Sequence, residues 1–241
     1  MKPVEMIKRA LGRELTDEDG RPIEIELIPG LNEEEITRFE STLPCPVPED
    51  VRNLLRFCRG FYGTAADVVD FTGQDLMFEN KTFFPHGVPI ASDGYGNDWV
   101  VDLSPDSTEF GPVWFACHDA PVILYQSSTL GEFLTELFKL CEPPHQSLVD
   151  DVHEDRIRQV WRTNPGVLTH QECLDSSDPI LREFAASLDP SFEIIDLRDA
   201  KPGDGFSWGR YGPYTVVKRY NNHPVFAYQR KKGWFQRLFG K

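Results

Sequence analysis

The pattern of hydrophobic and polar positions predicts a strand followed by a helix near the start of the chain. Residues 21–30 alternate isoleucine and leucine with glutamate, which is the period of a half-buried strand. Residues 32–43 then place apolar side chains at helical spacing. Asn32 precedes three glutamates, so we expect it to cap this helix, with the glutamates favoured by the helix dipole.

A second helix is predicted to begin near Pro48 and to stop at Gly60, since proline suits the first turn and glycine the end. Its apolar positions follow the i, i+3, i+4, i+7 pattern and predict one buried face, made of Val51, Leu54, Leu55 and Cys58.

The middle of the chain changes to short β-prone runs separated by Gly, Pro and Asp. These runs are DVVDF, GVPIAS, NDWVVDLS, GPVWFACH and APVILYQS, with no helix between them. Such spacing favours an antiparallel or mixed sheet over a doubly wound parallel one. Residues 127–140 then read as a covering helix, capped by Ser127 or Ser128.

The remaining third predicts more helices and a hairpin. Residues 152–161 and 169–189 have helical patterns, with a Thr169 to Glu172 capping box and an N-cap at Asp178. Residues 192–198 form a predicted strand, and residues 214–230 a hairpin that turns at two asparagines. The fold class is therefore α+β, with a mixed or antiparallel central sheet flanked by helices, plus C-terminal helices and a β-hairpin.

Composition is that of a folded protein, with 40% hydrophobic residues and 12% aromatics in 241 residues. No apolar run reaches the roughly 18 to 20 residues of a membrane span, and the first 15 residues lack a signal peptide's apolar core, so a cytoplasmic protein is expected. The five cysteines are odd in number and have no C-x-x-C pair. They predict reduced thiols and no metal site.

The formal charge of −14 is unevenly distributed. Residues 1–150 hold 11 Lys and Arg against 27 Asp and Glu, whereas residues 151–241 carry a small positive excess. An acidic body repels nucleic acid and attracts basic partners. Solvated surface explains the same acidity equally well.

The glycine-rich stretch at residues 93–98, DGYGND, invites a test for site chemistry. It lacks the ligand positions of a calcium-binding EF-hand loop and the third glycine of a dinucleotide fingerprint. Asp98 and Asp102 are separated by about 13 Å of strand, too far apart to act on one substrate bond. We interpret the stretch as a turn that Gly94 and Gly96 permit and that Asn97 or Asp98 stabilises by bonding to the loop's own amides.

No enzyme signature survives this reading. Cys117, His118 and Asp119 are adjacent on or beside a strand, so their side chains alternate in direction and cannot form a relay. We interpret Cys117 as core and the next two residues as turn. The chain has no G-x-S-x-G, P-loop or H-E-x-x-H motif, so we expect no catalytic residue and no cofactor.

Several segments together resemble the SUKH superfamily, the family of the Smi/Knr cell-wall-assembly regulators. They are ITRFESTLPCPVPEDVRNLLRFCRGFYG, PIASDGYGNDWVVDLS, GPVWFACHD and SSTLGEFLTELF. The resemblance divides the chain into residues 1–30 (helix and strand), 31–141 (SUKH-like domain) and 142–241 (C-terminal extension with a basic hairpin and tail). It implies an α+β fold without catalytic machinery. Bacterial members are similar to immunity proteins that bind toxins, whereas the fungal branch is regulatory.

The first functional hypothesis is an immunity protein whose acidic face occludes the basic active site of a toxin, with a nuclease as one candidate class. The candidate contacts lie in and after the glycine-rich stretch: Asp93, Tyr95, Asn97, Asp98, Asp102, Asp106 and Glu109. Each could equally be solvated surface or turn bonding, and the oligomeric state stays open.

The alternative is an intracellular regulatory or scaffolding adaptor, recruited to a membrane by a short basic amphipathic tail. The tail residues that define it are Lys231, Lys232, Trp234, Phe235, Arg237, Leu238 and Phe239. The same tail could instead dock on the chain's own acidic body, and nucleic-acid binding is opposed by that body.

Overall fold

The computed structural model describes residues 2–77, 81–212 and 214–230. Its strands form two sheets and one short pair, all with antiparallel neighbours. The large sheet has the order β12-β9-β8-β7-β6-β5-β4-β3. Its strands are β3 (Glu26–Pro29), β4 (Cys58–Tyr62), β5 (Val68–Asp70), β6 (Val88–Ser92), β7 (Asp98–Val101), β8 (Val113–Cys117), β9 (Val122–Ser127) and β12 (Gly205–Ser207).

The small sheet has the order β10-β11-β14-β13. Its strands are β10 (Val167–Thr169), β11 (Phe192–Asp196), β13 (Val217–Arg219) and β14 (Val225–Gln229). The separate pair consists of β1 (Leu15–Thr16) and β2 (Pro22–Ile23). These sheets together with the helices confirm the predicted α+β class.

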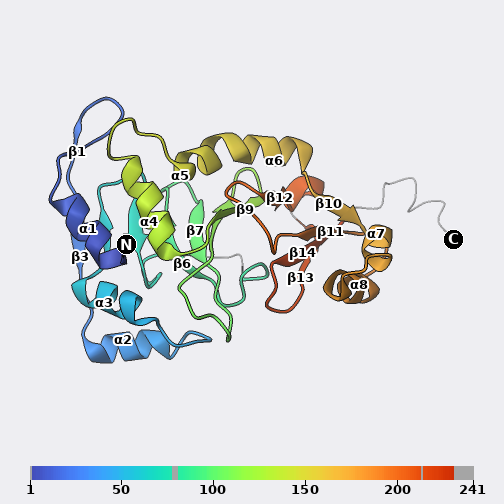
Figure 1. Ribbon diagram of the computed structural model, residues 1–241. Helices are drawn as coiled ribbons and strands as arrows, with labels where there is room; N and C mark the ends of the chain where they lie inside the picture. The colour runs from blue at the N-terminus through green and yellow to red at the C-terminus, as the bar shows by residue number, and fades with distance from the viewer. Residues whose placement is uncertain (1, 78–80, 213, 231–241) are drawn as a thin grey trace.

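The helices lie on the outer faces of the two sheets (Figure 1). Beside the large sheet are α1 (Pro3–Leu11), α2 (Glu33–Glu40), α3 (Glu49–Phe57) and α4 (Leu130–Lys139). Next come α5 (Leu148–Asp150), the π-helical turn η1 (Asp151–Arg156) and α6 (Ile157–Thr163). The small sheet is covered by α7 (His170–Leu174) and α8 (Pro179–Ala186), and a 3-10 turn, η2 (Gly209–Tyr211), follows β12.

Alternation along the central strands creates two separate cores. Trp99 and Val101 of β7 pack in the core beneath the helices, whereas Val100 packs in the core between the two sheets. Phe115 and Trp114 of β8 divide in the same way. The predicted two-faced pattern of β7 is confirmed, and the molecule has a helix, sheet, sheet, helix layering.

Several predicted caps are confirmed by hydrogen bonds. Asn32 accepts the Glu35 N–H and closes a capping box at α2. Thr169 does the same with Glu172 at α7, and Asp178 caps α8.

The cap predicted for α4 at Ser127 or Ser128 is wrong. Thr129 is the N-cap, and its side chain accepts the Glu132 N–H at 3.1 Å. Ser127 still belongs to β9, so the helix begins later than predicted. Ser128 donates its own N–H to the Glu132 carboxylate at 3.0 Å.

The helix predicted to end at Gly60 ends earlier, at Phe57. Cys58 already has extended backbone angles and opens β4. Gly60 therefore lies inside a strand, where a Cβ atom would meet the Val69 carbonyl oxygen at 1.9 Å. Close approach of β5, and not helix termination, requires glycine here.

The strand predicted over 21–30 is divided into β2 and β3, because its two halves pair with different neighbours. The C-terminal hairpin forms as expected, with Asn221 at a φ of 49°. All five cysteines are free and buried.

The C-terminal extension is joined to the large sheet by pairing. Strand β12 adds to its edge beside β9, with Phe206 opposite Ile123. The small sheet packs over the face of the large sheet that carries Val100 and Trp114. The predicted boundary between residues 141 and 142 stays a prediction.

Candidate functional site

The turn between β6 and β7 is held together by one carboxylate. Asp93 accepts the N–H groups of Tyr95 at 2.8 Å and Asn97 at 3.1 Å, together with the Asn97 side-chain amide at 2.5 Å. We expected Asn97 or Asp98 to make the backbone bonds. The first residue of the turn makes them instead, and Asn97 accepts the His118 N–H from the next hairpin at 2.8 Å.

Tyr95 lies at the tip of this turn with 82% of its surface exposed. The glycines on either side, Gly94 and Gly96, have φ values of 76° and 89°, which L side chains rarely adopt. A Cβ on Gly94 would lie 3.2 Å from Asp67, and one on Gly96 would lie 3.9 Å from His118. Tyr95 therefore stands between the loop that carries Asp67 and the turn after β8.

The turn is also contacted by η1, a segment that follows the large sheet's strand β9 and helix α4 in the chain. His153 of η1 lies with Nε2 3.0 Å from the Asp93 carboxylate. Its ring stacks on Trp99, with centroids 5.9 Å apart, and meets Phe115 edge to face at 5.3 Å. Sequence reasoning did not single out His153, and its only signal was a lone histidine in the acidic run DDVHED.

The pKa values of two carboxyl groups in the turn are shifted in opposite directions. Burial raises the pKa of Asp93, but hydrogen bonds from Asn97, His153 and Tyr95 outweigh it and bring that pKa below its usual value. Burial, and then the charge of Asp93, raise the pKa of Asp98 to about 6. Within the described residues, Asp98 has no hydrogen bond or ion pair to offset this cost.

The loops that meet at this end of the large sheet carry acids and no strong bases. Segments 63–67, 93–98, 117–121 and 147–155 contain no lysine and no arginine. We call the surface formed by Asp67, Tyr95, Asp98, Asp119 and Glu154 the acidic end. Of these, Asp67, Tyr95, Asp119 and Glu154 are exposed and Asp98 is half-buried.

Asp102 has a different environment, on the same face of the sheet as Asp98. Both its oxygens accept hydrogen bonds from the Arg219 guanidinium, at 2.8 and 2.7 Å, and both side chains are almost fully buried. Arg219 also donates to the carbonyl oxygens of Phe83 and Asn222. Burial raises the pKa of Asp102 and the Arg219 charge opposes that rise. The pair links β13 of the extension to the large sheet.

The structure does not bring the seven predicted contact residues together. Three are buried and occupied by internal partners, so their expected role as direct contacts is corrected: Asp93, Asn97 and Asp102. Tyr95 and Asp98 reach the acidic end. Asp106 and Glu109 are exposed, but they follow the opposite end of β7. The tail residues Lys231, Lys232, Trp234, Phe235, Arg237, Leu238 and Phe239 lie outside the described residues.

Comparison with known proteins gives one family. Residues 30–136 match the model of the SMI1 / KNR4 family (SUKH-1). Residues 30–136 therefore form a SUKH region of the chain. A search of curated proteins finds no match to it.

The SUKH match covers most of the acidic end but ends before η1. Asp67, Tyr95, Asp98 and Asp119 fall inside residues 30–136, whereas His153 and Glu154 come after it. A segment beyond the matched SUKH region therefore contributes to this surface.

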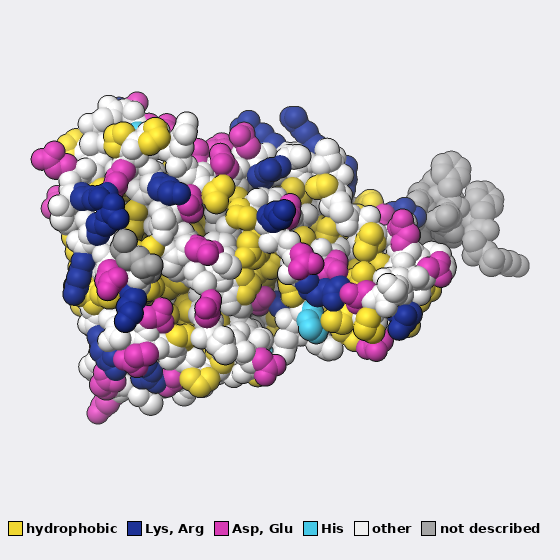
Figure 2. All heavy atoms as spheres, in the orientation of Figure 1, with side chains coloured by type: hydrophobic (Ala, Val, Ile, Leu, Met, Phe, Trp, Pro, Cys, Tyr) yellow, Lys and Arg dark blue, Asp and Glu magenta, His cyan; other side chains and the backbone are white. Residues whose placement is uncertain are grey.

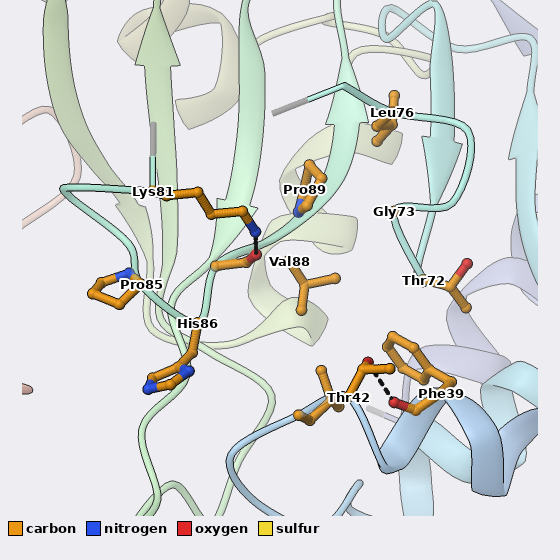
Figure 3. Close-up of a pocket in the computed structure, with 12 residues that line it drawn as sticks. Phe39, Thr42, Thr72, Gly73, Leu76, Lys81, Pro85, His86, Val88 and Pro89 are labelled. Carbon is orange, nitrogen blue, oxygen red and sulfur yellow. Dashed lines mark hydrogen bonds between the residues drawn. The ribbon is translucent and has the colours of Figure 1, made fainter. Parts of the chain in front are cut away.

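A cavity of about 400 Å³ lies at the other end of the SUKH sheet (Figure 3). Residues at the end of α2 form one side of it, and Lys81, His86 and their neighbours form the other. The Thr42 and Thr72 hydroxyls already donate to the Phe39 carbonyl and the Asp70 carboxylate. The described residues that line it include no carboxylate and no cysteine, and its titratable side chains are Lys81 and His86.

The described part of the chain lacks two further features. No group of three or more His, Cys, Asp and Glu side chains there is placed to hold a metal ion. No helix there has the length and apolar character needed to cross a membrane.

Proposed function

We propose that this SUKH protein is a non-catalytic protein-binding module, an immunity protein that neutralises a bacterial toxin by covering the toxin's basic active site with the acidic end. One observation carries the proposal beyond family membership: a fully presented Tyr95 stands among carboxylates that have no lysine or arginine in their own loops. A nuclease is the toxin class that fits best, because a cleft that binds nucleic acid is basic.

The charge of the acidic end differs from that of the surface over α2 and α3. There, Arg52 pairs with Glu40, and Arg56 pairs with Glu33 and Glu49. Figure 2 shows acidic and basic side chains intermixed on the face that it displays. Paired charges cancel at a distance, so the carboxylates of the acidic end, which have no lysine or arginine in their own loops, supply the field that attracts a basic partner.

Tyr95 supplies the anchor that charge alone does not. Tyrosine is enriched among the few interface residues that carry most of the binding energy. The Asp93 hydrogen bonds already fix the turn on which it stands, so binding orders few additional torsions.

Asp98 supports the same reading. Its half-buried carboxyl group has no compensating cation among the described residues, as the raised pKa reflects. A lysine or arginine from a partner would provide that compensation, and the complex would then recover part of the cost that the free protein bears.

The proposal predicts that the reading frame beside this gene encodes a protein with a toxic module, and it is tested by identifying that frame and co-expressing the module with the full chain. We expect the full chain to restore growth of cells that produce the module, and to copurify with it in a salt-sensitive complex. Toxicity that persists at full expression of this chain, together with no complex at low salt, contradicts the proposal.

A further inference from the structure

We infer that His153, which lies outside the matched SUKH region, is a positioning residue of the partner-binding surface: it holds the Asp93 to Asn97 turn so that Tyr95 is presented. This inference rests on the proposed function for its purpose. The contact itself is independent of any partner.

The segment that carries His153 is firmly joined to the SUKH sheet. Trp99 Nε1 donates to the Gln126 side-chain oxygen at 3.2 Å, and Gln126 Nε2 donates to the Leu148 carbonyl at 3.1 Å. Gln126 is fully buried, so its bond with Trp99 is shielded from water. The Ser147 hydroxyl donates to the Glu136 carbonyl at 2.6 Å. These bonds fix the place where η1 begins.

Two neighbouring side chains of the π-helical turn η1 point in different directions. Val152 is buried in the core beneath the helices. His153 points to the turn, with its ring against both Trp99 and Phe115 and its Nε2 at Asp93. A π turn adds a residue to the regular helix, and such turns occur frequently at functional sites.

The Asp93 carboxylate is the link from His153 to Tyr95. One oxygen accepts the two backbone N–H groups that shape the turn, and the other accepts Asn97 Nδ2 and faces His153. Hydrogen bonds to a charged group are the stronger class, so loss of the His153 donor weakens the hold on this carboxylate. The turn would then sample other conformations.

The contact between His153 and Asp93 lies at the acidic end, next to the surface on which Tyr95 is exposed. Glu154, the next residue, is exposed on the acidic end, with its carboxylate 3.5 Å from His153 Nδ1. Two further carboxyl groups feel the charges of this contact: Asp98 feels that of Asp93, and Asp150 feels those of Glu154 and His153. A partner that covers Tyr95 therefore also meets the segment after the SUKH match.

The test compares two replacements of His153 in the full chain. His153→Phe keeps an aromatic ring against Trp99 and removes the donor, whereas His153→Gln loses the ring and keeps a donor. His118→Phe is the matched control, because His118 is an exposed histidine of the same surface whose side chain does not contact Asp93.

Amide hydrogen exchange at Tyr95 and Asn97 is the first readout, and it needs no partner. We expect exchange about 10-fold faster in His153→Phe, and within about 3-fold of the unmodified chain in His153→Gln and His118→Phe. Unchanged exchange in His153→Phe overturns the inference. Equal acceleration in His153→Gln also overturns it, since ring packing would then be the whole role.

Affinity for the toxic module is the second readout. We expect His153→Phe to bind about 10-fold more weakly and His153→Gln to recover most of that loss. Binding that is unaffected by His153→Phe rejects the positioning role and leaves the proposed function standing. Absence of any complex with the unmodified chain rejects the proposed function, and the exchange data still decide whether His153 holds the turn.

Discussion

Asp98 and Asp102 lie on the same face of the large sheet, at the two ends of β7, and their surroundings differ sharply. Asp102 is buried and held by two hydrogen bonds from Arg219. Asp98 is half-buried, has no cation among the described residues, and stands beside the exposed Tyr95. One end of the strand is closed by the C-terminal extension, and the other end is left open.

The difference teaches how one residue type can serve stability or binding according to its neighbours. A buried carboxylate that is fully paired contributes to a defined packing arrangement, because removing its partner leaves an uncompensated charge. A partly buried carboxylate without a partner costs stability in the free protein. We propose that the second is kept because a partner compensates it.

The largest expected effect is at the closed end. Replacing Asp102 by Asn leaves the Arg219 charge buried without its carboxylate, so the free energy of unfolding should fall by about 3 to 5 kcal/mol. Urea denaturation of the full chain measures it. Asp106→Asn, an exposed change four residues further on, should alter stability by less than about 0.5 kcal/mol. A loss below about 1 kcal/mol for Asp102→Asn would show that the two sheets are not locked at this point.

The next effect is at the open end and concerns binding only. Tyr95→Ala should weaken the complex with the toxic module by about 2 kcal/mol, or about 30-fold, with stability unchanged because the side chain is exposed. Tyr214→Ala is the matched control, since Tyr214 is 88% exposed on the extension. Equal losses for the two variants, measured by calorimetric titration, would remove Tyr95 as the anchor.

The smallest effect concerns Asp98 and depends on pH. Its pKa of about 6 in the folded chain lies above the value of about 3.9 for an unfolded chain, so its ionised form opposes folding above pH 6. That opposition fades as the pH falls from about 6 to 4. Asp98→Asn should therefore stabilise the protein by about 1 kcal/mol at pH 8, a value reduced for partial exposure, and by less at pH 5.

The same Asp98→Asn variant should bind the toxic module more weakly than the unmodified chain, despite its greater stability. Denaturation at the two pH values and one titration at pH 8 measure both effects. A variant that is less stable at pH 8 than the unmodified chain contradicts the account of this carboxyl group.

Local signals in the sequence predicted much of the fold. The alternation in β7 and the capping residues Asn32, Thr169 and Asp178 act within a few residues, so the chain alone reveals them. Gly60 could not be interpreted in this way, because the contact that requires glycine comes from β5.

The site was less predictable for the same reason. The turn at residues 93–97 was recognised from its glycines, but Asp102 looked like a further surface acid. Its partner Arg219 is 117 residues away in the chain. His153 was missed because its contact with Asp93 spans 60 residues. Pairings over such distances are set by tertiary packing, which hydrophobic periodicity does not encode.

The measurement that tests the central claim most directly is the affinity of the toxic module for two charge-reversed variants with equal net charge. Asp67→Lys with Asp119→Lys changes the acidic end, and Asp106→Lys with Glu109→Lys changes the opposite end of β7. We predict a loss of about 100-fold or more for the first pair and about 3-fold or less for the second, because close charges act more strongly than distant screened ones. Equal losses for both pairs, or a larger loss for the second, would contradict the claim that the acidic end is the binding surface.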